Sequence, residues 1–86
     1  MKKNVLKVVI SRDKEGYYIA DVPVLQYCMS YGDTIEDAKK NIQEAALWVL
    51  ETLQQEWVNI PVNMNAPIFY EYLIVEKKSS QQLILA

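Results

Sequence analysis

Hydrophobic and polar positions follow two different periods along this chain. Residues 5–10 are mostly apolar and rich in β-branched side chains, residues 17–22 are again mostly apolar, and a polar stretch that ends at Gly16 separates the two runs. This pattern predicts a hairpin of two strands. A short third strand is expected around 28–30, and the apolar run 68–75 predicts a last strand.

A helical period dominates the middle of the chain. Asp33 and Thr34 are both good N-cap residues, and Thr34 with Asp37 approximates a capping box. The apolar residues that follow recur every three or four positions and form one broad stripe. The stripe consists of Ile35, Ala38, Ile42, Ala45, Ala46, Val49, Leu50, Leu53 and Trp57. We therefore predict a helix over 35–57 that ends before Pro61.

The predicted order of elements is three strands, a helix and a strand. This order indicates an α+β fold in which a single helix packs on a small, mainly antiparallel sheet. At 86 residues the chain is one domain, and so small a core leaves apolar surface for another chain to cover. The domain is expected to span 1–76, followed by a polar tail, 77–86, that ends in a short apolar segment.

The composition excludes most catalytic chemistry. The chain has no histidine, the residue most used for acid–base catalysis and metal binding near neutral pH. Cys28 is its one cysteine, which excludes an internal disulfide or a zinc cluster, and a half-buried strand residue is favoured over a nucleophile. The net charge of −2 argues against dedicated nucleic-acid binding. No apolar run is long enough to cross a membrane and no signal peptide is recognisable, so a cytoplasmic protein is expected.

Four carboxylates near predicted strand ends or loops are candidates for a metal site or for acid–base work. They are Asp13, Glu15, Asp21 and Asp33. We favour solvated turn and capping roles, because Asp33 can cap the helix and Asp13 can stabilise the hairpin turn. We therefore expect no enzyme activity, no metal and no cofactor.

Large side chains at positions where the pattern predicts exposure to solvent are better candidates for a binding role. Trp48 lies opposite the apolar stripe of the predicted helix, and it is either an anchor for another chain or an incidental surface residue. The strand 68–75 carries large residues on both faces, including Phe69, Tyr70 and Tyr72. Such a strand is either central in its sheet or covered by a partner.

Several short motifs follow one another in a fixed order between residues 13 and 61. They are Asp13-Lys14-Glu15-Gly16-Tyr17-Tyr18-Ile19-Ala20-Asp21-Val22-Pro23, Leu25 with Cys28, Ser30-Tyr31-Gly32-Asp33-Thr34, Ile35-Glu36-Asp37-Ala38, Asn41-Ile42-Gln43-Glu44-Ala45 and Ile60-Pro61. As an ordered set they resemble HicB-type antitoxin domains over roughly residues 5–75. The family usually has Pro-Gly before the cysteine, whereas Gln26-Tyr27 stands here, so that Tyr27 places an aromatic ring where a glycine is usual.

The resemblance implies a partial ribonuclease-H-like fold without the active site of the nuclease. It also implies a protein that binds and neutralises a small, basic, RNA-cleaving toxin of HicA type by stoichiometric contact, and that forms dimers or tetramers. An acidic chain suits a basic partner. Nothing after Glu76 is long enough for the C-terminal DNA-binding domain that many members carry, so direct DNA binding is not expected.

The alternative is an orphan relative that forms oligomers and binds a small molecule or a nucleic acid. In both cases the expected contact residues are Tyr27, Trp48, Phe69, Tyr70 and Tyr72.

Overall fold

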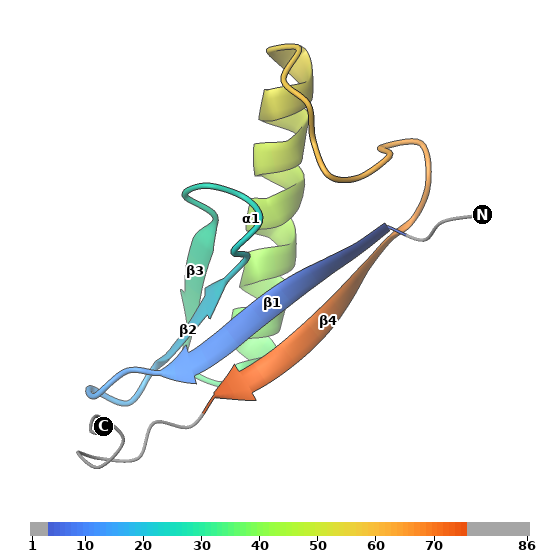
Figure 1. Ribbon diagram of the computed structural model, residues 1–86. Helices are drawn as coiled ribbons and strands as arrows, with labels where there is room; N and C mark the ends of the chain where they lie inside the picture. The colour runs from blue at the N-terminus through green and yellow to red at the C-terminus, as the bar shows by residue number, and fades with distance from the viewer. Residues whose placement is uncertain (1–3, 76–86) are drawn as a thin grey trace, which may run out of the picture.

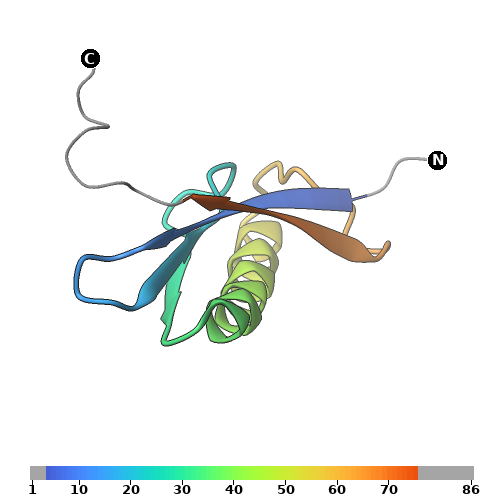
Figure 2. The same ribbon diagram turned by 90° about the horizontal axis from the view of Figure 1, so that it is seen from below.

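The computed structural model describes residues 4–75, which form a four-stranded sheet with one helix packed against one of its faces (Figure 1). The elements are β1 (Asn4–Arg12), β2 (Tyr18–Asp21), β3 (Met29–Gly32), α1 (Ile35–Gln55) and β4 (Ile68–Val75). Figure 2 shows the two layers from the end, with α1 entirely on one side of the strands. The α+β fold and its predicted order of elements are confirmed. The expected polar tail, 77–86, lies outside the described residues.

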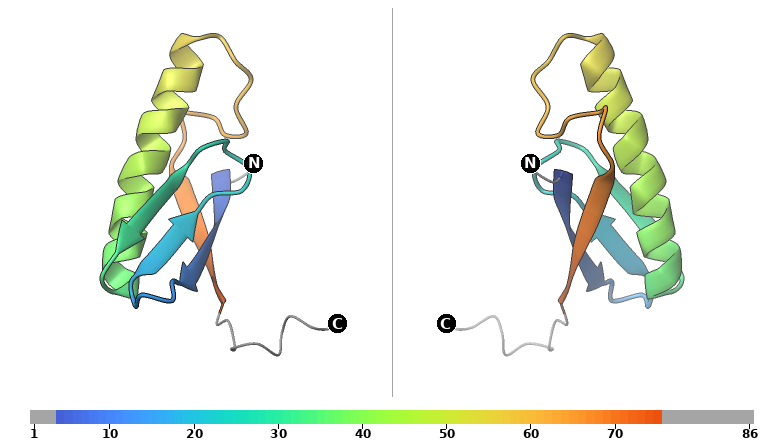
Figure 3. Two further views of the ribbon diagram at one scale, coloured as in Figure 1. Left: turned by 90° about the vertical axis from the view of Figure 1, so that its left-hand side faces the viewer. Right: turned by 90° about the vertical axis from the view of Figure 1, so that its right-hand side faces the viewer.

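The strands are arranged in the order β3-β2-β1-β4. β1 pairs antiparallel with β2, and β2 with β3, whereas β1 and β4 run parallel. A parallel pair requires a crossover, which is provided by α1 and the loop that follows it. The two side views of Figure 3 show this loop leaving the end of α1 and returning to β4. Two of the three pairings are antiparallel, in agreement with the prediction.

The position of β4 decides between the two alternatives left open by its sequence. Within residues 4–75, β4 lies at the edge of the sheet and β1 lies inside it. The expectation of a central strand is therefore wrong for the described chain, because β1 takes that place and buries Leu6, Val8 and Ile10 completely or nearly so. The other alternative, a β4 covered by a partner, stays a prediction.

The core lies between the sheet and α1. Even-numbered residues of the strands point toward the helix, and odd-numbered residues point to the open face. The buried apolar residues are Leu6, Val8, Ile10, Ala20, Val22, Leu25, Cys28, Ala38, Ile42, Ala46, Leu50 and Val62. Four of them come from the predicted helical stripe, which confirms the face by which α1 packs.

The ends of α1 follow from local hydrogen bonds. Thr34 is the N-cap, and its Oγ1 accepts a hydrogen bond from the N–H of Asp37 at 3.0 Å, as predicted. At the other end the N–H of Val58 donates to the Leu53 carbonyl, which is one of the bonds of a Schellman motif. Trp57 lies in this motif with a φ of 61°, and its side chain is 94% exposed. Its expected place in the buried stripe is wrong, because the helix ends at Gln55 and the left-handed turn directs the ring outward.

The junction between β3 and α1 is unusually close. A Cβ on Gly32 would lie 2.3 Å from the backbone nitrogen of Ala38. Only glycine fits there, so Gly32 sets how near the sheet approaches the first turn of the helix. The one described helix, α1, lacks the long apolar stretch needed to cross a membrane.

Candidate functional site

The open face of the sheet is largely apolar. Val5, Val9, Leu73 and Val75 all have odd numbers and therefore point away from α1. Leu73 is 60% exposed, and a cleft of about 570 Å³ lies over this part of the sheet. The cleft is lined by β1 and β4 and by Pro23, Val24 and Pro61 from two loops. An exposed apolar surface of this kind is typical of a site that contacts another molecule.

The predicted contact residues of β4 lie on both of its sides. Phe69 is half-exposed on the open face, whereas Tyr70 and Tyr72 are half-buried on the side of α1. The rings of Tyr70 and Tyr72 stack with their centroids 6.5 Å apart. The Tyr72 hydroxyl accepts a hydrogen bond from Nε2 of Gln43, and Nζ of Lys39 lies 4.7 Å from its ring centroid. Tyr72 therefore fastens β4 to the helix, and Tyr70 stacks beside it against the core.

Tyr70 is also electrostatically perturbed. Burial, together with the neighbouring Tyr72 and Cys28, raises the pKa of its hydroxyl above the ordinary 10.0. The protonated hydroxyl is thus the form that the folded chain favours.

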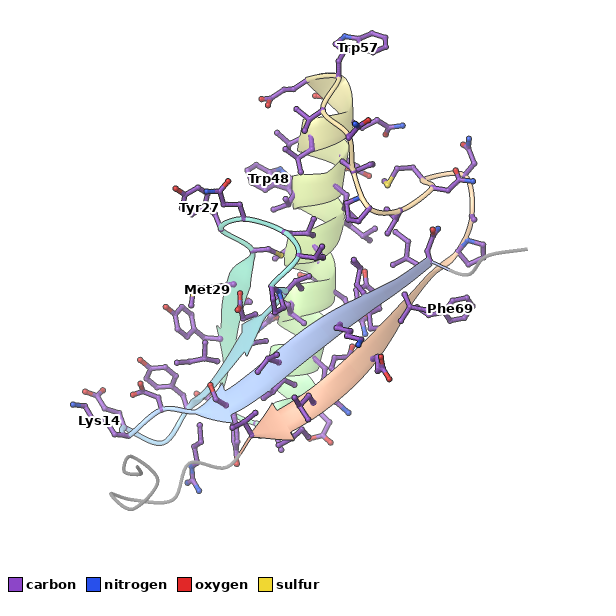
Figure 4. All side chains as sticks on the ribbon, viewed as in Figure 1. Lys14, Tyr27, Met29, Trp48, Trp57 and Phe69 are labelled. Atoms are coloured by element: carbon purple, nitrogen blue, oxygen red, sulfur yellow. The ribbon has the colours of Figure 1, made fainter. Side chains whose placement is uncertain are left out.

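Tyr27 and Trp48 are among the most exposed large side chains. Their exposed fractions are 89% and 69%. Figure 4 shows both on one side of the molecule, with Phe69 on the opposite side. The predicted contact residues therefore do not form one site, because Tyr27 and Trp48 lie on the other side of the molecule from Phe69 of β4.

The backbone of Tyr27 is strained for a tyrosine. Its φ is 64°, in the left-handed region that favours glycine. The glycine that is usual at this position in the family that the chain resembles would adopt this conformation without strain. Tyr27 adopts it with strain, and its ring lies almost fully in solvent. The strained backbone and the large exposed ring together make Tyr27 a candidate for contact with another molecule.

A cleft of about 510 Å³ at the junction of β3 and the start of α1 combines aromatic rings with carboxylates. Tyr17 and Tyr31 meet edge to face, with ring centroids 5.5 Å apart and planes at 80°. Asp33 and Asp37 line the same cleft, as does Asn41, whose Nδ2 donates to the Tyr31 carbonyl at 2.7 Å. We call this the acidic cleft. No short-range sequence pattern predicts this cleft.

Negative charge on the hairpin turn raises the pKa of Tyr17, one of the two tyrosines that line the acidic cleft. The carboxylate of Asp13, with smaller contributions from desolvation and Glu15, raises the pKa of the Tyr17 hydroxyl. The carboxylates that line the acidic cleft, Asp33 and Asp37, attract cations, and the faces of tyrosine rings bind ammonium and guanidinium groups. The acidic cleft is therefore suited to a lysine or arginine side chain of a partner.

Of the other candidates for chemistry, Cys28 and Asp13 have structural roles, whereas the capping role expected for Asp33 is wrong, because Thr34 is the N-cap of α1. Cys28 is buried, and burial, with the nearby Asp21, raises the pKa of its thiol above 9.0, which favours the unreactive thiol form. Oδ2 of Asp13 accepts a hydrogen bond from the N–H of Glu15 at 3.0 Å within the hairpin turn. Among residues 4–75, no three cysteine or carboxylate side chains are grouped so that they could hold a metal ion.

Comparison with known proteins identifies similar sequences. Residues 6–72 match the model of a family described as the HicB-like antitoxin of bacterial toxin–antitoxin systems. The chain is similar to a UPF0150 protein of Synechocystis sp., with 41% identity over 56 residues, 65% of this chain and 81% of that protein. It is also similar to a UPF0150 protein of Thermoplasma acidophilum, with 39% identity over 54 residues, 63% of this chain and 78% of the relative. No solved structure matches the chain significantly.

Proposed function

Because the chain belongs to the family of HicB-like antitoxins of bacterial toxin–antitoxin systems, we propose that it binds and neutralises a small RNA-cleaving toxin of HicA type. The mode of action is stoichiometric protein–protein contact without catalysis. An RNA-cleaving protein acts where cellular RNA is, so we expect the complex in the cytoplasm.

The acidic cleft is the observation that supports this proposal best. A protein that cleaves RNA needs basic side chains to bind the phosphate backbone. Asp33 and Asp37 beside the rings of Tyr17 and Tyr31 offer such side chains both opposite charge and aromatic faces. An antitoxin that binds the basic surface of the toxin competes with RNA for it. Neutralisation then requires no chemical step.

Co-expression with a HicA-type toxin encoded next to this chain tests the proposal. We expect a stable complex and restored growth. The double variant Asp33→Asn/Asp37→Asn should slow association at low salt at least about tenfold, because it removes two charges from the acidic cleft. The matched variant Glu44→Gln/Glu51→Gln removes two charges from the exposed side of α1 and should change the rate much less. Failure to form a complex, or to restore growth, would contradict the antitoxin role.

An orphan protein that binds a small apolar molecule is the second candidate. The cleft of about 570 Å³ on the open face favours it, because its volume lies within the range of small-molecule sites and its walls include Val5, Val24 and Leu73. In that case the purified chain would bind an apolar dye in this cleft, and Val24→Lys would abolish the binding. A toxin complex that survives Val24→Lys would favour the first candidate.

We also propose that the chain associates with itself as a dimer or tetramer. The exposed apolar residues of β4 and of the open face support this, since so small a two-layer domain gains stability by covering them.

A further inference from the structure

β4 has the composition of an inner strand and the position of an edge strand. Glu71 is its only charged residue, and the other seven are aliphatic or aromatic. α1 packs mainly against β3 and β2, so β4 is incompletely covered: Leu73 on the open face and Ile74 on the helix side are 60% and 46% exposed. Strands that are apolar on both faces are normally buried on both. Residues 4–75 do not provide that cover.

The outer side of β4 also presents backbone groups. Alternate residues of an edge strand direct their N–H and C=O groups away from the sheet, ready to pair with another strand. No strand within the described residues pairs with this side, since β4 neighbours only β1.

We propose that β4 pairs antiparallel with β4 of a second copy of the chain, around a two-fold axis at Tyr72. In an antiparallel pair, directly opposite residues point to the same face of the sheet, so even-numbered residues must face even-numbered ones. Two symmetric registers fulfil this condition with most of the strand paired, one centred on Glu71 and one on Tyr72.

Charge selects between the two registers. Centring on Glu71 would bring two carboxylates directly opposite each other, which is destabilising, and would place Val75 opposite Pro67, which has no N–H to donate. Centring on Tyr72 places Glu71 opposite Leu73 and Tyr70 opposite Ile74. All of β4 from 69 to 75 then pairs, and the two Tyr72 residues become cross-strand neighbours, an arrangement that favours aromatic contact.

The size of this interface predicts its strength. An interface of standard size buries about 800 Å² per partner, and smaller ones are typical of transient pairs. The half-exposed side chains of the single strand β4 can bury less surface than an interface of standard size does. We therefore expect a dimer that dissociates on dilution.

The symmetry has a structural consequence. A two-fold axis through an antiparallel pair is perpendicular to the sheet, so both copies of α1 lie on the same side. The two sheets become one, in the order β3-β2-β1-β4-β4-β1-β2-β3. The acidic cleft and Tyr27, at the far side of each copy, remain accessible. The dimer therefore has room for one toxin on each copy.

Disulfide trapping of the full chain tests the register. In a Cys28→Ser background, Tyr72→Cys should form a disulfide-linked dimer under mild oxidation, because the two Cβ atoms would be opposite each other. Glu71→Cys is the matched control and should not, since its copies would be diagonal neighbours beyond disulfide reach. Trapping through Glu71→Cys but not through Tyr72→Cys would overturn the register.

Light scattering after size-exclusion chromatography tests the interface without cysteine substitutions. The unmodified chain should have twice the mass of one chain at high concentration. Leu73→Lys should weaken association at least about tenfold, whereas Met29→Lys, which also adds a lysine at an exposed apolar position but lies on β3 at the opposite edge of the sheet, should not. Circular dichroism checks that both variants fold. A dimer that is unaffected by Leu73→Lys would refute the β4 interface.

This inference rests on the proposed self-association, and its failure is distinguishable from failure of the proposed function. A chain that stays monomeric at every concentration but still neutralises the toxin refutes only the dimer. A chain that dimerises through β4 but binds no toxin refutes only the antitoxin role. A toxin strand that carries a cysteine and is trapped against Tyr72→Cys in place of a second copy would also overturn the pairing of β4 with β4.

Discussion

Asn4 and Asn63, 59 positions apart in the sequence, are joined by a reciprocal pair of hydrogen bonds. Nδ2 of Asn4 donates to the Asn63 carbonyl at 2.7 Å, and Oδ1 of Asn4 accepts from the Asn63 N–H at 2.9 Å. The same Nδ2 also donates to the carbonyls of Ala66 and Pro67, each at 3.2 Å. Because Asn4 begins β1 and Pro67 immediately precedes β4, one buried side chain aligns the starts of both strands.

Asn4→Ala should therefore lower the free energy of unfolding by about 1–3 kcal/mol, since it leaves part-buried backbone groups without partners. Urea denaturation followed by circular dichroism measures the change. Asn59→Ala, at an exposed position of the same loop, is the control and should change stability by less than about 0.5 kcal/mol. Equal effects of the two substitutions would contradict the role given to Asn4.

Gly32→Ala should destabilise the fold by more than about 2 kcal/mol. The new Cβ would lie 2.3 Å from the backbone nitrogen of Ala38, and neither backbone can move without separating β3 from α1. Gly16→Ala is the matched control: the space around Gly16 is open, and only its φ of 106° opposes a side chain. Gly16→Ala should lower the free energy of unfolding by about 1 kcal/mol. If close packing at Gly32 were unimportant, thermal melts would show that Gly16→Ala lowers the melting temperature more than Gly32→Ala does.

Tyr27→Gly should raise the free energy of unfolding by up to about 1 kcal/mol, because glycine adopts the left-handed conformation without strain. The same variant should bind the toxin more weakly, since it loses the exposed ring. Tyr27→Ala separates the two effects. It removes the ring but keeps the Cβ, so that binding should weaken without the gain in stability. If Tyr27→Gly is the less stable chain, the strain argument fails.

Trp48→Ala should weaken binding to the toxin or to a second copy by about 2 kcal/mol or more if Trp48 is an anchor. Its exposed position on α1 predicts little change in stability, which denaturation should confirm. Glu44→Ala, one turn earlier and also exposed, is the control for a change on the surface of α1. Unaltered affinity for both partners would make Trp48 an incidental surface residue.

Stability should fall in alkaline solution. Burial holds the pKa of Tyr70 above 10.0 and that of Cys28 above 9.0 in the folded chain, so the unfolded chain loses these protons first as the pH rises. The free energy of unfolding is therefore unaffected by these groups below about pH 9 and decreases above it. Tyr70→Phe should flatten the decrease above about pH 10. An unchanged pH dependence in this variant would show that Tyr70 does not contribute.

The parts of the fold that depend on neighbouring residues could be predicted from the sequence. The cap at Thr34, the period-2 strands and the buried face of α1 are set by residues a few positions apart, and the structure confirms them. The helical period predicts the wrong environment for Trp57, because the Schellman turn that exposes this side chain depends on backbone hydrogen bonds.

Features that depend on strand order and register could not be predicted. The same apolar pattern in 68–75 suits a central strand or a covered edge, and only the pairing with β1 shows the edge. The acidic cleft was missed for a similar reason. Tyr17 and Tyr31 meet because β2 and β3 pair with Ile19 opposite Tyr31, a register that no short-range pattern specifies.

The parallel pairing of β1 with β4 also controls when the domain can form. The first half of β1 pairs with β4 alone, since β2 reaches only from Val9 to Arg12. During synthesis, which proceeds from the N-terminus at roughly 5–20 residues per second, the apolar residues of β1 must wait for residue 68 and beyond. Contacts so distant in sequence also slow folding. A ribosome that stalls before β4 would thus release a chain whose β1 stays half-paired, a natural target for proteases.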